Sequence, residues 1–524
     1  MNINRTEIIA SALSACAQEM LASLIRTAYS PNIKERGDCS TALCDLEGRT
    51  LALAANAPAH LGATLRLVPE ILRRFPVNTL KEGDAFLAND PYIVGVTHLN
   101  DCTVACPTFV DGQVVGFAVT VAHHSDVGGR VPGSEAGDSN SIFQEGLRVP
   151  PVQIMAQGEY RQDLLEMFLL NSRMPEFGKG DLMAQVAAAS RGASRVKNLF
   201  ERYGNKQVLL SIEEMFSMTE KRVRAQIRKH LRSGTFFADD YLDEDGVSGE
   251  PVKLAASVTI QDEHITIDLS ECDAQIGSGK NVPISHTLAT VYCVLKSFLD
   301  PDGSINEGLY RTVSVVAPVG RVVNPVAPAA VSSRNITSMI LADVLAVAIG
   351  QAHTSYQIAY SGPFHGTILA GTDPRTSKPF IDYENFCGGQ GATSLGHGMS
   401  AVHVYMTNTS NLPVESMEIE FPVQVERYEI REGSGGKGRF NGGDGIIRDL
   451  RMNGDHMTVA LRSARQRFPA RGLHGGEAGQ TGAFILNPES DHPIQLPSTS
   501  SETPLKKGDL LRILTPGGGG MYQA

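Results

Sequence analysis

Residues 98–126 bring together two kinds of side chain that bind divalent metals, imidazoles and carboxylates: His98, Asp101, His123, His124 and Asp126. This mixture suits Zn²⁺, Mn²⁺ or Fe²⁺, whereas a set rich in thiolates would favour structural zinc. A small ligand set also leaves a coordination position free for water, which a catalytic metal needs. The alternative is that these side chains only cap strand ends, and spacing alone leaves both interpretations open.

The intervening sequence predicts a β-hairpin that would gather these residues at its open end. Two apolar runs, CTVACPTFV and QVVGFAVTVA, flank an Asp-Gly pair, which is typical of a two-residue turn. Asp101 would begin the first strand and His123–His124 would end the second, with opposed Cβ atoms roughly 5 Å apart. A strict two-residue turn places His124 on the face of Asp101, whereas one bulge residue places His123 there. The periodicity does not choose between these registers.

The whole chain predicts a multidomain α+β protein with a mixed N-terminal domain, a helical middle segment and a Gly- and strand-rich C-terminal half. Helical spacing of apolar residues predicts helices at 6–29, 57–76, 285–299 and 336–352, and throughout most of 160–232. The predicted domains are 1–155 (mixed α+β, with the metal site), 156–235 (helical), 236–360 (α+β) and 361–524 (β-rich and Gly-rich).

Composition excludes several classes of partner and compartment. The 524 residues are 42% hydrophobic and 20% charged, as in a globular protein, and the net charge of -11 argues against nucleic acid or an anionic membrane. No run approaches the roughly 20 apolar residues of a membrane span, and the N-terminus does not resemble a signal peptide. The eight scattered cysteines form no CxxC pair, which favours reduced thiols and a cytoplasmic location.

Several longer motifs resemble the hydantoinase B/oxoprolinase family. They are ERGDCSTALCDLEGRTLA, APAHLGA, LANDPYIVGVTHLNDCTV, AHHSDVGGRVPGS and SIFQEGLRVPP, with GSGGKGRFNGGDGIIR and TPGGGGMY nearer the C-terminus. The resemblance covers nearly the whole chain. Relatives in this family include ATP-dependent hydantoinases, 5-oxoprolinases, a caprolactam-opening enzyme and the metal subunits of acetone and acetophenone carboxylases.

The resemblance implies a set of site residues. The metal ligands that it implies are Asp38, His98, Asp101 and His123, with zinc favoured over manganese. This choice favours the bulged register, and His124 or Asp126 would then move protons. His60 in APAHLGA is either a loop histidine that packs against its surroundings or a residue that lines the site.

The resemblance also implies a function and a partner. The chain would be the metal-binding subunit of an ATP-dependent amidohydrolase that opens a cyclic amide such as a hydantoin, 5-oxoproline or a lactam. A hydantoinase A-type subunit would bind ATP and Mg²⁺ and phosphorylate the amide, and metal-activated water would attack the phosphorylated substrate. The absence of a GxxxxGK[ST] motif here fits ATP binding elsewhere.

The family implies an assembly of A–B pairs, a heterotetramer or larger. Two alternative functions stay open at this point. One is a subunit of an ATP-dependent ketone carboxylase, and the other is a non-catalytic scaffold for the ATP-binding subunit.

Overall fold

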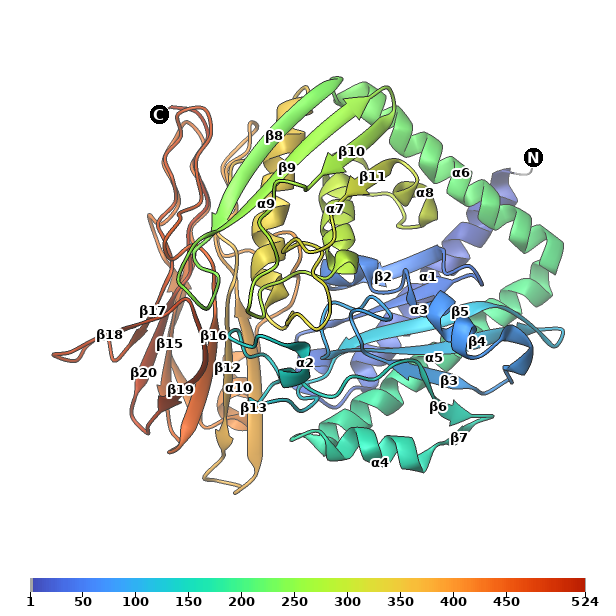
Figure 1. The fold of residues 1–524 in the computed structure, drawn as a ribbon, viewed down its shortest axis with the longest axis horizontal. Coiled ribbons are helices and arrows are strands. Elements are labelled where there is room, and N and C mark those ends of the chain that lie inside the picture. Colours follow the sequence, from blue (N-terminus) through green and yellow to red (C-terminus); the bar gives the residue numbers. More distant parts are fainter. Residues whose placement is uncertain (1–2, 524) are drawn as a thin grey trace.

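A seven-stranded sheet holds the predicted hairpin (Figure 1). The computed structural model describes residues 3–523, and the strand order of this first sheet is β2-β1-β5-β4-β3-β6-β7, with every neighbouring pair antiparallel. Its strands are β1 (Cys39–Cys44), β2 (Thr50–Ala55), β3 (Ala85–Ala88), β4 (Asp101–Val110), β5 (Gln113–His123), β6 (Val152–Ala156) and β7 (Glu159–Tyr160).

Strands β4 and β5 form the hairpin with one bulge. Asp111 and Gly112 make the turn with φ of 49° and 75°, the positive values that the tight hairpin turn requires. The register shifts between residues 108 and 109, so that Asp101 lies opposite His123. The bulged register is therefore the correct one, and a strict two-residue turn does not describe this hairpin.

Long amphipathic helices cover one face of the first sheet. α5 (Pro175–Tyr203) packs on β4 and β5, and α1 (Ile3–Thr27) packs on β1, β2 and α5. Gly192 allows the close approach of these two helices, because a Cβ there would lie 2.2 Å from Sδ of Met20. The shorter elements of this part are α2 (Pro31–Lys34), η1 (Pro58–Gly62), α3 (Leu67–Arg74), η2 (Val77–Thr79), η3 (Ile142–Gln144) and α4 (Gln162–Leu170).

The predicted division into four domains stays a prediction. The first sheet continues through β7 to Tyr160, just beyond the expected boundary at 155. α5 lies on that sheet, and α6 (Asn205–His230) contacts α1, α7 (Ile284–Leu299) and α8 (Glu307–Tyr310). The helices at 156–235 therefore pack onto their neighbours on both sides. This packing follows from their apolar stripes, which must be buried against another element.

A second sheet and two apolar helices form the middle of the molecule. The strand order is β11-β10-β9-β8, and α9 packs on β8 and β9 and contacts α7. The elements are β8 (Gly234–Leu242), β9 (Val252–Gln261), β10 (His264–Asp268), α7 (Ile284–Leu299), α8 (Glu307–Tyr310), β11 (Val313–Val316) and α9 (Arg334–Ala352).

The C-terminal half contains two sheets that share one apolar core. Their orders are β13-β12-β16-β19 and β14-β15-β20-β17-β18, and Leu369, Phe386, Leu450 and Ile513 are buried in the same cluster. The elements are β12 (His365–Thr372), β13 (Pro379–Phe386), α10 (Val414–Glu420), β14 (Val423–Ile430), β15 (Ile446–Met452), β16 (Met457–Arg462), β17 (Ala483–Leu486), β18 (Ile494–Leu496), β19 (Thr499–Leu505) and β20 (Leu510–Leu514).

Glycine-rich segments of this half pack backbone against backbone. Gly518 accepts a hydrogen bond from Gly436 N at 2.8 Å and donates one to Gly443 O at 2.9 Å. A Cβ on Gly442 would lie 2.0 Å from Gly518 O, and one on Gly389 would lie 1.9 Å from Gly443 O. Only glycine permits spacing this close, which explains the glycine-rich sequence.

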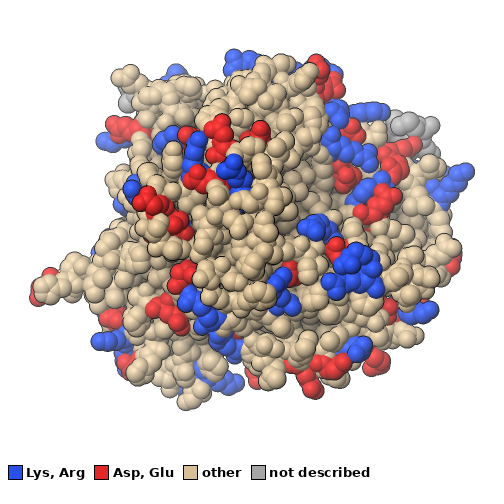
Figure 2. Space-filling model, viewed as in Figure 1, with Lys and Arg blue, Asp and Glu red and all other residues tan. Residues whose placement is uncertain are grey.

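Two helices, α1 and α9, are long and apolar enough to cross a membrane by length and composition alone. α9 is buried inside the core, and α1 buries one face against the first sheet and α5. α9 is therefore a core helix and α1 an amphipathic helix of the surface, and the expectation that no run is long and apolar enough for a membrane span does not hold by length and composition alone. On the face that Figure 2 shows, acidic and basic side chains are interspersed.

Candidate metal centre

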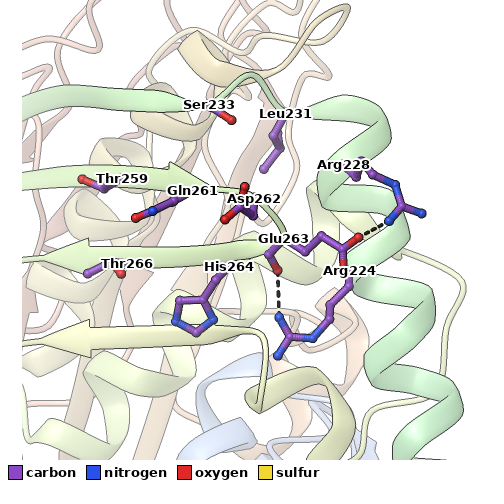
Figure 3. A pocket seen from close by; sticks show the side chains of 10 residues that line it. All are labelled: Arg224, Arg228, Leu231, Ser233, Thr259, Gln261, Asp262, Glu263, His264 and Thr266. Carbon is purple, nitrogen blue, oxygen red and sulfur yellow. Dashed lines mark hydrogen bonds and ion pairs between the residues drawn. The ribbon is translucent and has the colours of Figure 1, made fainter.

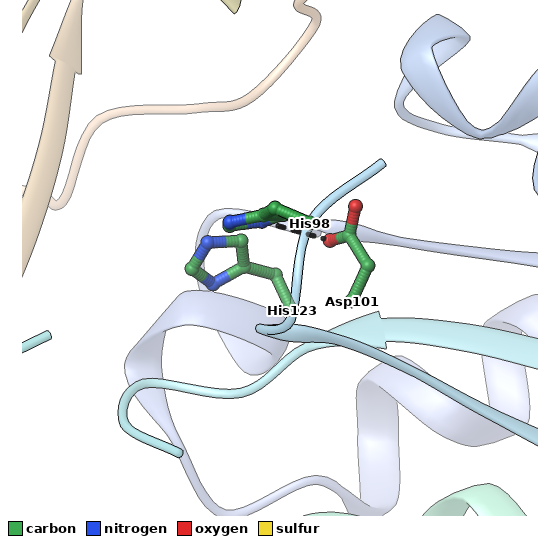
Figure 4. Close-up of side chains that lie close together, drawn as sticks. All are labelled: His98, Asp101 and His123. Carbon is green, nitrogen blue, oxygen red and sulfur yellow. Dashed lines mark ion pairs between the residues drawn. The ribbon is translucent and has the colours of Figure 1, made fainter. Parts of the chain in front are cut away.

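His98, Asp101 and His123 converge at the open end of the β4–β5 hairpin (Figure 4). One ligand atom from each residue lies within 4.8 Å of the other two. Asp101 Oδ1 is 3.4 Å from His98 Nε2, and the two imidazole rings lie 4.8 Å apart between centroids. All three side chains are buried. The spacing of the sequence therefore becomes a compact group of two imidazoles and one carboxylate.

Local hydrogen bonds place these side chains. His98 O accepts a hydrogen bond from Asp101 N at 3.2 Å, which turns the chain into β4. His123 N donates to Asp38 O at 3.1 Å, which ties the end of β5 to the start of β1. Asn32 Nδ2 lies 2.8 Å from His123 Nδ1 and donates to His123 O at 3.0 Å. The amide of Asn32 thus holds the ring of His123 from one side, and Nε2 faces the group and Glu135 Oε1 at 3.7 Å.

The donor atoms of the group fit a divalent metal. Asp101 Oδ1, His123 Nε2 and both ring nitrogens of His98 are buried without a hydrogen-bond partner in residues 3–523. Burying one such atom unpaired costs about 1–3 kcal/mol. Imidazole nitrogen and carboxylate oxygen are ordinary ligands of zinc, so a bound ion would satisfy Asp101 Oδ1, His123 Nε2 and one ring nitrogen of His98. The residues present therefore fit the metal that the sequence predicts.

The ionisation of the group also suits a metal. Burial, together with the charge of Arg334, lowers the pKa of His98 to about 4, so the imidazole is neutral at pH 7. Burial opposes ionisation of Asp101, but the neighbouring imidazoles of His98 and His60 hold the pKa of its carboxyl well below the ordinary value. A metal requires a neutral imidazole and an ionised carboxylate, and no proton has to leave either.

His60 reaches the group from η1. Its Nε2 lies 3.5 Å from Asp101 Oδ1, and its Nδ1 lies 2.9 Å from Ser40 Oγ. Burial lowers its pKa, but the carboxylates of Asp101 and Asp38 outweigh burial and raise it above the ordinary value. Of the two interpretations of this residue, the structure favours the one in which His60 lines the site.

Asp38 does not join the group of three. It lies partly exposed immediately before β1, and its backbone carbonyl, rather than its carboxylate, contacts His123. Its charge nevertheless acts on His60. Its role as a fourth ligand stays a prediction.

His124 and Asp126 have other partners. His124 Nε2 lies 2.9 Å from Gln185 Oε1, and its ring packs edge-on against Phe168 of α4. Asp126 accepts hydrogen bonds from Gly133 N at 3.0 Å and pairs with Arg173 at 2.9 Å. These contacts explain how both residues hold the loop after β5. Proton transfer by either residue stays a prediction.

A second carboxylate, Glu135, and two arginines complete the surroundings. Glu135 Oε1 lies 3.2 Å from His98 Nδ1 and 3.0 Å from Arg334 Nη1, and its Oε2 pairs with Arg462. Burial opposes its ionisation, yet Arg462 and the other cations hold its pKa far below the ordinary range. The ring of Tyr383 packs on His123 with centroids 4.7 Å apart. α9 and the C-terminal sheet thus close over the hairpin end.

Sequence reasoning missed Glu135, Tyr383 and Arg462. Each lies in a different part of the chain, and only the fold brings them to the histidines. Arg462 carries the one local signal, because it ends the apolar run MTVAL in a strand. Charged residues are rarely buried without a partner, so a charge at that place predicts a buried ion pair.

One surface cavity lies away from the metal group. It has a volume of about 670 Å³ and opens beside α6, β9 and β10 (Figure 3). Its lining includes Arg224, Glu263 and His264, and Arg224 donates to the Glu263 carbonyl at 3.0 Å. None of its lining residues belongs to the metal group.

The comparisons with known proteins point to one family. The family model described as hydantoinase B/oxoprolinase matches residues 3–523. The caprolactamase subunit beta of Pseudomonas jessenii is 30% identical over 98% of this chain and 89% of its own length. The 5-oxoprolinase of Dictyostelium discoideum is 31% identical over 97% of this chain, which spans only 39% of that longer protein.

A solved structure gives the same result for the fold. The crystal structure of the ATP-dependent caprolactamase from Pseudomonas jessenii matches with a TM-score of 0.91 at 28% identity, over 100% of this chain and 91% of the other. This match confirms the predicted multidomain α+β class. Together with the family model, it shows that the chain belongs to the hydantoinase B/oxoprolinase family.

Proposed function

We propose that this chain is the metal-binding subunit of an ATP-dependent hydrolase that opens a cyclic amide. The observation that carries the proposal is the buried group of His98, Asp101 and His123, whose ligand atoms lie together without hydrogen-bond partners. Other buried polar atoms, such as the ring nitrogens of His286 and His365, also lack a partner, and this group differs from them because its ligand atoms converge within 4.8 Å of one another. Membership of a family with a caprolactamase subunit and a 5-oxoprolinase supports the substrate class.

The chain's own residues would prepare the site. His98, Asp101 and His123 would hold a divalent metal, with zinc favoured over manganese and Asp38 as the proposed fourth ligand. The bound metal would supply Lewis acidity toward water and the substrate. Burial would exclude bulk water, so that fixed charges act strongly on the reacting groups. His60, held by Ser40, would keep a proton at Nε2 beside Asp101.

A separate subunit would provide the ATP-dependent step. An unstrained amide is a poor electrophile, and phosphorylation of its oxygen creates a better leaving group. The caprolactamase relative is named a subunit, and the longer 5-oxoprolinase has room for additional modules outside the part that matches this chain. We infer an A-type ATP- and Mg²⁺-binding partner, an assembly of A–B pairs and a cytoplasmic location.

Metal content tests the site first. Elemental mass spectrometry of the purified chain is expected to find near-stoichiometric zinc or manganese, which a His98→Ala/His123→Ala variant should lack. The matched control is His230→Ala/His353→Ala, which removes a stacked histidine pair with ring centroids 5.3 Å apart. No metal in the wild type, even after reconstitution, would overturn the proposal.

Activity with the A-type partner tests the reaction. ATP-dependent opening of hydantoin, 5-oxoproline or ε-caprolactam is expected to require the metal-loaded chain and to proceed without bicarbonate. A strict requirement for bicarbonate, with incorporation of its carbon into product, would instead indicate a carboxylase. Full activity of the His98→Ala/His123→Ala variant would indicate a scaffold.

A further inference from the structure

Glu135 is the point where three separate parts of the molecule meet beside the metal group. It lies in the loop after β5, and its side chain is 1% exposed. Its carboxylate contacts His98 of the hairpin region, Arg334 of α9 and Arg462 of β16. It also lies 3.7 Å from His123 Nε2. No other carboxylate in the described chain pairs with both of these arginines.

We propose that Glu135 is a positioning residue that sets which ring nitrogen of His98 is available to a metal. The inference rests on the proposed function in that it takes the histidines and Asp101 as metal ligands. Two carboxylates flank the imidazole of His98, with Asp101 Oδ1 3.4 Å from Nε2 and Glu135 Oε1 3.2 Å from Nδ1. A neutral imidazole has one N–H. A carboxylate 3.2 Å from Nδ1 favours the tautomer with the hydrogen on that nitrogen through its charge, although the two atoms do not meet in hydrogen-bond geometry in this structure. Nε2 then keeps its lone pair toward Asp101.

The two arginines keep the Glu135 carboxylate ionised and fixed. Arg334 Nη1 lies 3.0 Å from Oε1, and Arg462 pairs with Oε2, so each carboxylate oxygen faces a different guanidinium. Arg334 is held in turn by Thr97 at 3.0 Å and by the Ser332 carbonyl at 2.9 Å. The metal affinity of the hairpin end therefore depends on α9 and on the C-terminal sheet.

His123 is oriented differently, which makes the role of Glu135 specific. Asn32 holds Nδ1 of His123 at 2.8 Å and also binds the carbonyl of the same residue. The ring orientation of His123 thus has its own support from α2. Loss of Glu135 should act mainly through His98.

The test uses the full-length chain and two changes at Glu135. Glu135→Gln keeps the shape but removes the charge, and Glu135→Asp keeps the charge for both arginines but withdraws the carboxylate from His98. The matched control is Glu145→Gln, a second buried carboxylate that accepts hydrogen bonds from Val331 N and Ser332 N. The measurements are the Zn²⁺ dissociation constant by chelator competition, the visible spectrum of the Co²⁺-loaded chain, and urea denaturation without metal.

Both Glu135 variants are expected to bind Zn²⁺ about 10–100-fold more weakly, the usual effect of removing the outer partner of a metal-binding histidine. Their Co²⁺ spectra should retain the wild-type form, since the ligands stay the same, and Glu145→Gln should bind Zn²⁺ like the wild type. Wild-type affinity in both Glu135 variants would overturn the inference, as would a Co²⁺ spectrum showing a lost ligand.

Two further outcomes separate the possible failures. If Glu135→Gln does not fold, Glu135→Asp decides the question, because it still neutralises both arginines. If the wild type itself binds no Zn²⁺, the proposed function fails. If the wild type and both Glu135 variants bind Zn²⁺ equally well, only the role of Glu135 fails.

Discussion

Two buried clusters of charged and polar side chains in this molecule differ in how completely they are paired. In the first, around Arg465, the guanidinium bonds Asp240 and Asp343 at 2.7 Å each. The remaining carboxylate oxygens accept hydrogen bonds from Tyr241 N and Ser361 N, both at 2.9 Å. Every carboxylate oxygen of this cluster therefore has a partner.

The second cluster lies at the end of the hairpin and gathers side chains that can bind a metal, two imidazoles and one carboxylate. His98, Asp101 and His123 present nitrogen and oxygen atoms toward one another, and several of these atoms lack a hydrogen-bond partner in residues 3–523. All four carboxylate oxygens of the Arg465 cluster are paired, which fits a structural role, although Arg465 Nε has no hydrogen-bond partner in residues 3–523. Unpaired ligand atoms indicate that the hairpin cluster is completed by something from outside the chain.

Removal of the Arg465 guanidinium should lower the free energy of unfolding strongly, because it is the cation at the centre of the first cluster. Arg465→Met leaves Asp240 and Asp343 buried without their partner, which is expected to cost about 3–5 kcal/mol in the free energy of unfolding. Urea denaturation of the metal-free chain measures this cost. Arg467→Met, at an exposed neighbouring arginine, should change the stability little. Equal stability of the two variants would contradict the structural role of the Arg465 cluster.

Loss of one ligand in the hairpin cluster should remove the extra stability that a bound metal gives to the chain. A metal at 100 times its dissociation constant adds about 2.7 kcal/mol to the stability of the chain that binds it. His98→Ala should abolish this increment, because it removes a ligand next to Asp101. Thermal unfolding with and without Zn²⁺ measures the increment. A variant that keeps the full increment would show that His98 is not a ligand.

The local sequence predicted the hairpin and the three central residues well. The Asp-Gly turn, the strand lengths and the family motifs bring His98, Asp101 and His123 together, and the bulge is a local irregularity that the family resemblance favoured. Helix positions were also predicted, except that 57–76 contains a 3₁₀ turn before α3. The turn, the strands and the helices depend on residues that are close together in the sequence, so sequence patterns can predict them.

The surroundings of the site could not be predicted in the same way. Glu135, Tyr383 and Arg462 reach the histidines through contacts between distant segments, and no periodicity records such contacts. For Asp38, the structure gives a backbone contact to His123, and the ligand role that the family motif implies for its carboxylate stays a prediction. Local patterns thus predicted elements better than they predicted partners.

Asn32 gives a smaller effect that sharpens the distinction between ligands and their supports. Asn32→Ala removes the group that holds His123 Nδ1 at 2.8 Å, so Zn²⁺ binding is expected to weaken about 10–100-fold without being lost. Chelator competition measures the change. Complete loss of metal from a folded variant would show that Asn32 does more than orient the ring.

The effect expected of Glu145 depends on pH. Its Oε1 accepts hydrogen bonds from Val331 N at 2.7 Å and Ser332 N at 2.8 Å, but Oε2 is buried without a partner in the described chain. Burial raises the pKa of this carboxyl from 4.5 to about 8. Between those values the folded chain holds a proton that the unfolded chain has released, so the stability contributed by Glu145 falls as the pH rises.

Glu145→Gln removes this titration while keeping an oxygen for the two backbone donors. The free energy of unfolding of the variant, relative to the wild type, should therefore improve from acidic pH to a pH above the raised pKa, as urea denaturation across that range would measure. Glu159→Gln, exposed on β7, serves as the control and should show no such trend. A difference that does not vary with pH would mean that the Glu145 carboxylate is as well compensated as those around Arg465.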